Sequence, residues 1–158
     1  MNKLIASVLA LLLITSCAEK NLNEDDGDVI DGMRADGTIV PGSQADLHYN
    51  IGDTIYFDFD SSSLNPESKD LAKEQVQWIN QNDKAVIIEG HCDERGTRDY
   101  NIGLGERRAH AVKNYMLSLG VTPDRIDTVS YGKERPAVVG SGEDVWTKNR
   151  RAVTIVLK

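Results

Sequence analysis

The chain has 158 residues, a formal net charge of −7 and a hydrophobic content of 40%. This length suits one folded domain with appended segments. The negative net charge argues against nonspecific binding of nucleic acid, and no nucleic-acid partner is expected. Only two cysteines occur, Cys17 and Cys92. Because Cys17 directly follows a signal-like segment and is expected to be lipidated, a structural disulfide is not expected.

Residues 1–16 have the pattern of a secretory signal peptide. Lys3 supplies a positive charge, and residues 4–14 are apolar but too short to span a bilayer as a mature helix. The sequence Thr15-Ser16-Cys17 follows and resembles a bacterial lipobox. The resemblance implies cleavage before Cys17 and acylation of Cys17, and two or more acyl chains would anchor the protein stably. The alternative is a plain signal peptide with a chance cysteine.

Residues 17–50 are predicted to be a lipidated, flexible acidic linker. The segment is rich in Asn, Asp, Glu and Gly and contains the run Glu24-Asp25-Asp26-Gly27-Asp28. No apolar period persists, and such composition favours disorder. A calcium loop would need a fuller ligand spacing and a bidentate glutamate, so no metal site is expected.

A folded domain is expected at residues 51–158. Residues 53–59 alternate as a strand with Ile55, Phe57 and Phe59 on one face. Asn65 is predicted to cap a helix that begins at Pro66. A second strand is expected at residues 84–90.

Strands and helices continue to alternate in the second half of the domain. A long helix is predicted from about residue 97 to residue 119, with Gly120 as its left-handed cap. A strand at 125–131, a long loop at 134–147 and a final strand at 152–157 follow. The order β-α-β-α-β-β predicts an α+β domain. Because the last strand has no helical crossover before it, a mixed sheet is expected.

The junction between the second strand and the long helix carries an unusual density of charge. Asp93 follows the strand directly, whereas Asn101, Leu104 and Arg108 share one helix face at i, i+3 and i+7. The first amides of the helix are unpaired and attract anions. A pocket built this way suits a zwitterion, with a carboxylate on Arg108 and an ammonium on Asp93. The alternative is an ordinary surface ion pair or solvated charges.

Several motifs in this order resemble the family of OmpA-like peptidoglycan-binding domains, over residues 51–158. They are Tyr56-Phe57-Asp58-Phe59-Asp60, Gly90-His91-Cys92-Asp93-Glu94-Arg95-Gly96, Tyr100-Asn101-Ile102-Gly103-Leu104-Gly105-Glu106-Arg107-Arg108-Ala109, Ser130-Tyr131-Gly132-Lys133-Glu134-Arg135-Pro136 and Asn149-Arg150-Arg151-Ala152-Val153. The resemblance implies a β-α-β-α-β-β sandwich with a mixed four-stranded sheet and helices packed on one side.

The resemblance also implies a ligand and a location. Members of the family bind the diaminopimelate of peptidoglycan stem peptides through the residues that match Asp93 and Arg108. Supporting contacts would come from Phe59, Asp60, Thr97, Asn101 and Leu104. Ala18 follows Cys17 and favours sorting of the lipoprotein to the outer membrane, with the domain facing the periplasm.

A protein partner is implied as well. Lipid-anchored members of the family bind TolB, the propeller protein of the Tol system, and so link wall attachment to membrane constriction during division. Glu94, Arg95 and Lys133 match positions on the TolB-facing surface. The alternative is that these residues are solvated loop charges. A wall-binding lipoprotein outside the Tol system is also compatible with the sequence.

An enzymatic alternative is a peptidoglycan hydrolase. A cleaving pair of carboxylates can be imagined from Asp60 with Asp93 or Glu94, and a nucleophile from Cys92 with His91. Neighbours on a strand face opposite sides, which argues against a Cys92–His91 pair. No spacing singles out a nucleophile with its base, so a non-catalytic binding protein without a cofactor is expected. His91-Cys92-Asp93-Glu94 has no accompanying His-x-x-x-His or Cys-x-x-Cys spacing, so no metal site is expected there. Cys92 is expected to be a buried packing thiol.

Overall fold

The structure is a computed structural model, and it describes residues 32–157. The predicted signal peptide and Cys17 lie outside the described residues.

Four strands form one mixed sheet in the order β1-β4-β2-β3. The strands are β1 (Thr54–Tyr56), β2 (Val86–His91), β3 (Ile126–Gly132) and β4 (Arg151–Val156). β2 pairs parallel with β3, whereas β4 pairs antiparallel with both β2 and β1. The predicted α+β class with a mixed four-stranded sheet is therefore confirmed. In this topology the carboxyl ends of β1, β2 and β3 share one edge with the start of β4.

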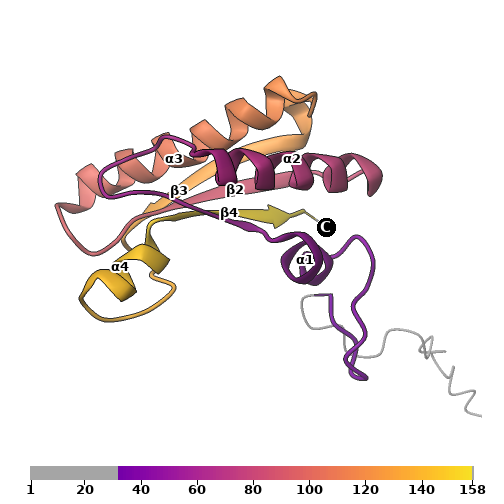
Figure 1. The fold of residues 1–158 in the computed structure, drawn as a ribbon, viewed down its shortest axis with the longest axis horizontal. Helices are drawn as coiled ribbons and strands as arrows, with labels where there is room; N and C mark the ends of the chain where they lie inside the picture. The colour runs from indigo at the N-terminus through magenta and orange to yellow at the C-terminus, as the bar shows by residue number, and fades with distance from the viewer. Residues whose placement is uncertain (1–31, 158) are drawn as a thin grey trace, which may run out of the picture.

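Two long helices cover one face of the sheet (Figure 1). α2 (Pro66–Gln81) begins at the predicted cap, where Asn65 Oδ1 accepts a hydrogen bond from the Ser68 amide at 2.7 Å. α3 (Arg98–Ser118) begins after Thr97, whose hydroxyl accepts from the Tyr100 amide at 3.3 Å. Such caps satisfy amide groups that the first turn of a helix leaves unpaired.

The core lies between the helices and the sheet. Apolar side chains on the inner faces of α2, α3, β1 and β2 are buried: Ala72, Val76, Ile79, Ala109, Val112, Met116, Ile55, Val86 and Ile88. Gly90 of β2 and Gly105 of α3 let the backbones meet, because a Cβ on Gly90 would collide with the Gly105 carbonyl oxygen. This close approach fixes the start of α3 against the end of β2.

The first strand is shorter than predicted. β1 ends at Tyr56, and the chain turns at Asp60, whose φ is +52°. Phe57 is buried as expected, but Phe59 is 61% exposed and not on the core face. The alternating apolar pattern of residues 53–59 does not predict the turn at Asp60, because this turn depends on contacts with other segments of the chain.

The loop predicted at 134–147 contains a short helix, α4 (Glu143–Asn149), which is a further correction. Two turns are too few to show an apolar period in the sequence. Gly120 has the predicted left-handed conformation after α3, with a φ of +101°. A short 3-10 turn, η2 (Pro123–Arg125), precedes β3.

The packed domain begins before Ile51. α1 (Gln44–Asp46) and a π-helical turn, η1 (Leu47–Ile51), continue directly into the domain, and Leu47 is fully buried in the core. Asp46 accepts a hydrogen bond from the Trp78 indole at 3.0 Å. Acidic composition predicted a linker up to residue 50, but composition cannot show that these polar residues have specific partners in the fold. The rest of that predicted linker, residues 17–31, lies outside the described residues.

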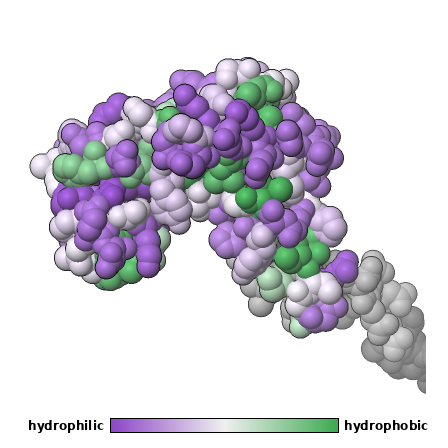
Figure 2. Space-filling model, viewed as in Figure 1, coloured by the Kyte–Doolittle hydropathy of each residue, from purple (hydrophilic) through white to green (hydrophobic). Residues whose placement is uncertain are grey.

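α1 and α4 lie near opposite ends of the sheet (Figure 1). Figure 2 shows a largely hydrophilic surface that is hollowed between these two regions. Among residues 32–157, no helix is long and apolar enough to cross a membrane.

Replacing Leu47 by alanine tests whether residues before Ile51 belong to the domain. Because Leu47 is fully buried, we expect Leu47→Ala to lower the free energy of unfolding by about 2–4 kcal/mol. Tyr49→Ala is the matched control: Tyr49 is 62% exposed, and we expect a change within about 0.5 kcal/mol. Urea unfolding of both variants measures the difference. Equal, small effects would mean that this segment does not contribute to the core.

Candidate binding site at the edge of the sheet

The topology gathers the charged motifs at one edge of the sheet. Phe59 and Asp60 follow β1, and Asp93 follows β2, both at the carboxyl ends of parallel-running strands. Arg150 precedes β4 and enters the same edge from the opposite direction. Segments far apart in the sequence therefore meet here, beside the first turns of α3.

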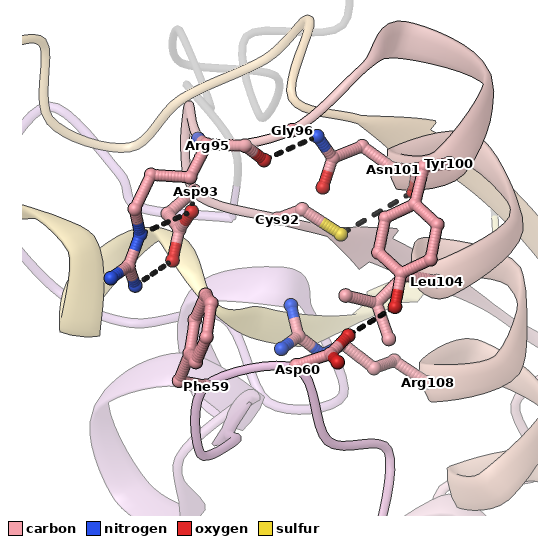
Figure 3. A pocket seen from close by; sticks show the side chains of 10 residues that line it. All are labelled: Phe59, Asp60, Cys92, Asp93, Arg95, Gly96, Tyr100, Asn101, Leu104 and Arg108. Carbon is pink, nitrogen blue, oxygen red and sulfur yellow. Dashed lines mark hydrogen bonds and ion pairs between the residues drawn. The ribbon is translucent and has the colours of Figure 1, made fainter.

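A pocket of about 150 Å³ opens at this edge and is called the edge pocket below (Figure 3). It is lined by Phe59, Asp60, Cys92, Asp93, Arg95, Gly96, Tyr100, Asn101, Leu104 and Arg108. The spacing of Asn101, Leu104 and Arg108 predicted a shared helix face, and all three line this pocket. Asp93, Phe59 and Asp60 join them, so the structure brings together every predicted ligand-binding residue except Thr97.

Arg108 is a fully buried cation held by backbone carbonyls. Its Nε donates to Ser61 O at 2.8 Å, Nη1 to His91 O at 2.8 Å and Nη2 to Asp58 O at 3.0 Å. A guanidinium has five N–H donors, so one on each terminal nitrogen is left over. Burial lowers the pKa of Arg108. No carboxylate among residues 32–157 forms a salt bridge with it, so a buried positive charge borders the pocket without a direct counter-ion.

Asp93 lies on the other side of the edge pocket, 4% exposed, and its charge is already paired. Its Oδ1 accepts from the Arg95 amide at 3.1 Å and from Arg95 Nε at 3.2 Å, and its Oδ2 accepts from Nη2 at 2.6 Å. Arg150 Nη1 is 3.6 Å from Oδ2. Burial raises the pKa of Asp93, but the hydrogen bonds from Arg95 outweigh burial and leave that pKa lowered. The position expected for a ligand ammonium is therefore filled by Arg95 in this structure.

Arg95 is held from two further sides by aromatic rings. Its guanidinium carbon is 4.1 Å from the centre of the Phe59 ring and 3.9 Å from the centre of the Trp146 ring. Cation–π contacts of this kind favour a cation between two ring faces. Sequence reasoning missed Trp146, because α4 was predicted as part of a loop.

Asp60 and Tyr100 form the exposed mouth of the edge pocket. The Tyr100 hydroxyl donates to Asp60 Oδ1, and this bond raises the pKa of Tyr100 (Figure 3). Both residues are exposed. Tyr100 was not among the predicted site residues, and no periodicity indicates that its hydroxyl would reach the loop after β1.

Thr97 and Asn101 shape the loop between β2 and α3. Thr97 caps α3 and does not line the edge pocket. Asn101 Nδ2 donates to Arg95 O at 2.8 Å and to Thr97 O at 3.0 Å. Leu104, 5% exposed, adds an apolar side chain to the lining. These residues fix the backbone from which Asp93 and Arg95 project.

Glu94 and Lys133 lie on the rim outside the edge pocket. Glu94 Oε1 accepts from the Ser141 hydroxyl at 2.5 Å and from the Trp146 indole at 2.9 Å. The Ser141 bond contributes most to a lowered pKa of Glu94. Lys133 Nζ donates to the carbonyls of Glu94 at 3.1 Å and Gly96 at 2.6 Å. Both charges therefore connect the loop after β2 to the segment between β3 and α4.

Cys92 and His91 have separate surroundings. Cys92 is buried, as expected, and its thiol donates to Asn101 O at 3.3 Å. Burial raises the pKa of Cys92 and lowers the pKa of His91 to about 4. The His91 ring packs near Tyr131, with 5.6 Å between ring centres. Among residues 32–157, no group of three or more His, Cys, Asp and Glu side chains is placed to hold a metal ion.

Comparison with known sequences places the chain in a family. The sequence profile of the OmpA family matches residues 56–150. The peptidoglycan-associated lipoprotein of Mesorhizobium japonicum is 44% identical over 154 residues, which cover 97% of this chain and 90% of that protein. The protein of the same name from Pseudomonas aeruginosa is 39% identical over 157 residues, which cover 95% of this chain and 94% of that protein.

Solved structures have the same fold. The peptidoglycan-associated lipoprotein of Burkholderia pseudomallei matches with a TM-score of 0.66 at 35% identity, over 70% of this chain and 98% of that one. The C-terminal domain of Helicobacter pylori MotB matches with a TM-score of 0.63 over 67% of this chain and 84% of that one, and at 19% identity it shows the fold alone. The chain therefore belongs to the OmpA family and, within it, to the peptidoglycan-associated lipoproteins.

Proposed function

We propose that the chain is an outer-membrane lipoprotein that binds peptidoglycan non-covalently and ties the outer membrane to the cell wall. The names of its relatives and its family support binding to peptidoglycan. The observation that supports a specific ligand is the Arg108 guanidinium, which is buried at the edge pocket and forms no salt bridge with a carboxylate of residues 32–157. A buried charge of this kind favours a ligand that brings the opposite charge.

The ligand group in this proposal is the free end of diaminopimelate, where one carbon carries both a carboxylate and an ammonium. The carboxylate would accept the two remaining N–H donors of Arg108, one from each terminal nitrogen. The ammonium would face Asp93, with Asp60 at the mouth as a second negative charge. Leu104 and Phe59 would flank the methylene chain, and Thr97 and Asn101 would hold the loop in place.

Binding without catalysis fits these residues better than hydrolysis does. A glycosidase needs one carboxyl group with a raised pKa to protonate the leaving oxygen. Asp93 has the opposite property, because Arg95 holds its pKa low. The pKa of Glu94 is lowered too, and Glu94 is on the rim. The proposed role is therefore attachment, with no bond broken.

The carboxylate contact can be tested with two stem peptides that differ at one residue. A peptide with diaminopimelate presents a carboxylate and an ammonium, whereas the same peptide with lysine presents only the ammonium. Loss of a charge-assisted bidentate contact should weaken binding by about tenfold or more. Calorimetric titration of the two peptides measures the ratio of their affinities. Equal affinities would contradict the assignment of Arg108.

Asp93→Asn completes this test on the protein side. We expect weaker binding of the diaminopimelate peptide and unchanged binding in the control Asp70→Asn, an exposed aspartate on α2. Arg108→Ala is a poorer variant, because it would also leave three backbone carbonyls without their donor and destabilise the fold. Wild-type affinity in Asp93→Asn would remove Asp93 from the site.

The lipid anchor is a separate part of the proposal, since Cys17 lies outside the described residues. We expect the mature protein to begin at Cys17 with acyl chains on that residue, and Cys17→Ser to be released from the membrane fraction. Intact-mass spectrometry of protein purified from its native host measures both features. An intact Met1 or an unmodified Cys17 would refute the anchor.

The partner in this proposal is TolB, which would dock on Glu94 and Lys133 of the rim and on Arg95 of the adjoining edge pocket. Because the rim adjoins the edge pocket, TolB and stem peptide should compete for the same desolvated charges. A pull-down of TolB from the same organism, with and without excess muropeptide, tests this competition. Simultaneous binding would reject a shared surface, and no binding of TolB would favour a wall-binding lipoprotein outside the Tol system.

A further inference from the structure

The Arg95 side chain occupies the place in which a ligand ammonium would meet Asp93. A carboxylate accepts about four hydrogen bonds. Arg95 supplies three of them to Asp93, through its amide, Nε and Nη2, and Arg150 Nη1 stands 3.6 Å from Oδ2. An ammonium can therefore approach Asp93 closely only if one of these donors withdraws.

The two arginines differ in their freedom to withdraw. The Arg150 side chain is only 6% exposed, and it is fixed by Nε donating to Phe57 O at 3.0 Å and Nη2 pairing with Glu143 at 2.6 Å. The Arg95 side chain is 30% exposed, and apart from Asp93 its contacts are the rings of Phe59 and Trp146. The Arg95 guanidinium is thus the group that can leave.

We propose that Arg95 is a resident stand-in for the ligand ammonium, which docks on Asp93 in the empty pocket and is displaced by diaminopimelate. This inference rests on the proposed function. When Arg95 is displaced, Asp93 keeps a positively charged partner only if the ligand brings its own ammonium. A ligand with a carboxylate alone cannot replace Arg95 in this way, so Arg95 becomes a specificity-determining residue.

The surroundings of Asp93 and Arg95 suit this exchange. Arg150 Nη1 is buried and has no hydrogen-bond partner in the described part of the chain, so it remains available to Asp93 while Arg95 is away. The hydrogen bond to Asp93 contributes most to the raised pKa of Arg95, and the nearby charges of Glu143 and Glu94 add to it, so a released guanidinium still has negative charges beside it. Departure of Arg95 also uncovers the Phe59 ring, which then can contact the methylene chain of the ligand.

A molecule cannot bind the ligand while the Arg95 side chain is docked on Asp93. The apparent affinity is therefore the intrinsic affinity multiplied by the fraction of time that Arg95 is undocked. If Arg95 is docked about 90% of the time, only about one tenth of the molecules are ready to bind, and the apparent affinity is about tenfold weaker than the intrinsic one. Removing the guanidinium should therefore tighten binding. An ordinary ligand-contacting arginine would have the opposite effect when removed.

The test is calorimetric titration of the diaminopimelate stem peptide into wild-type protein, Arg95→Gln and Arg98→Gln. Arg98 is an exposed arginine three residues away that pairs with Glu134 and does not line the pocket, so its variant controls for the lost charge. We expect about tenfold tighter binding in Arg95→Gln, an intermediate gain in Arg95→Lys, and wild-type affinity in Arg98→Gln. Equal or weaker binding in Arg95→Gln, with a native thermal unfolding profile, overturns the inference.

A fluorescence signal follows the exchange in the protein with Arg95 intact. The chain has two tryptophans, so Trp78→Phe leaves Trp146, which stacks on Arg95, as the reporter. Adding stem peptide should change Trp146 emission when Arg95 is present and much less in the Arg95→Gln background. If the stem peptide binds tightly and Trp146 emission does not change, the displacement of Arg95 is contradicted but the proposed function is not. Absence of peptide binding in both wild type and Arg95→Gln overturns the proposed function and the inference with it.

Discussion

The hydrogen bonds from Arg108 to three backbone carbonyls are the interaction on which the edge pocket depends. They join the loop after β1, through Asp58 and Ser61, to the end of β2 at His91. A guanidinium can do this because its donors are spread in a rigid plane. The same bonds hold a positive charge away from water at one wall of the pocket. One side chain therefore positions the loops and, in the proposed function, also supplies the cation that meets the ligand carboxylate.

The opposite wall of the pocket carries an ion-pair network around the negative charge of Asp93. Asp93 is paired with Arg95 and approached by Arg150, and Arg95 in turn lies between Phe59 and Trp146. Through Glu94, which accepts hydrogen bonds from Ser141 and Trp146, this network reaches the segment around α4. Contacts between neighbouring side chains therefore connect the edge pocket to the rim.

The sequence predicted those features that local periodicity determines. The spacing of Asn101, Leu104 and Arg108 places them on one face of α3, and the position of Asp93 directly after a buried strand places it at the sheet edge. The partner of Asp93 could not be predicted, because Arg95 reaches it through a side-chain conformation that two distant rings stabilise. Burial of Leu47 was missed for a similar reason: one apolar residue in a polar segment has no period. Thr97 caps α3 in the structure, and its contact with the ligand stays a prediction.

The most direct test of this account is a crystal structure of the protein with a diaminopimelate stem peptide bound. The account predicts that the peptide's free diaminopimelate carboxylate lies within hydrogen-bond distance of Arg108 Nη1 and Nη2, inside the pocket lined by Asp60, Asp93 and Leu104. A peptide bound on another surface, or in the pocket with its carboxylate turned away from Arg108, would contradict it.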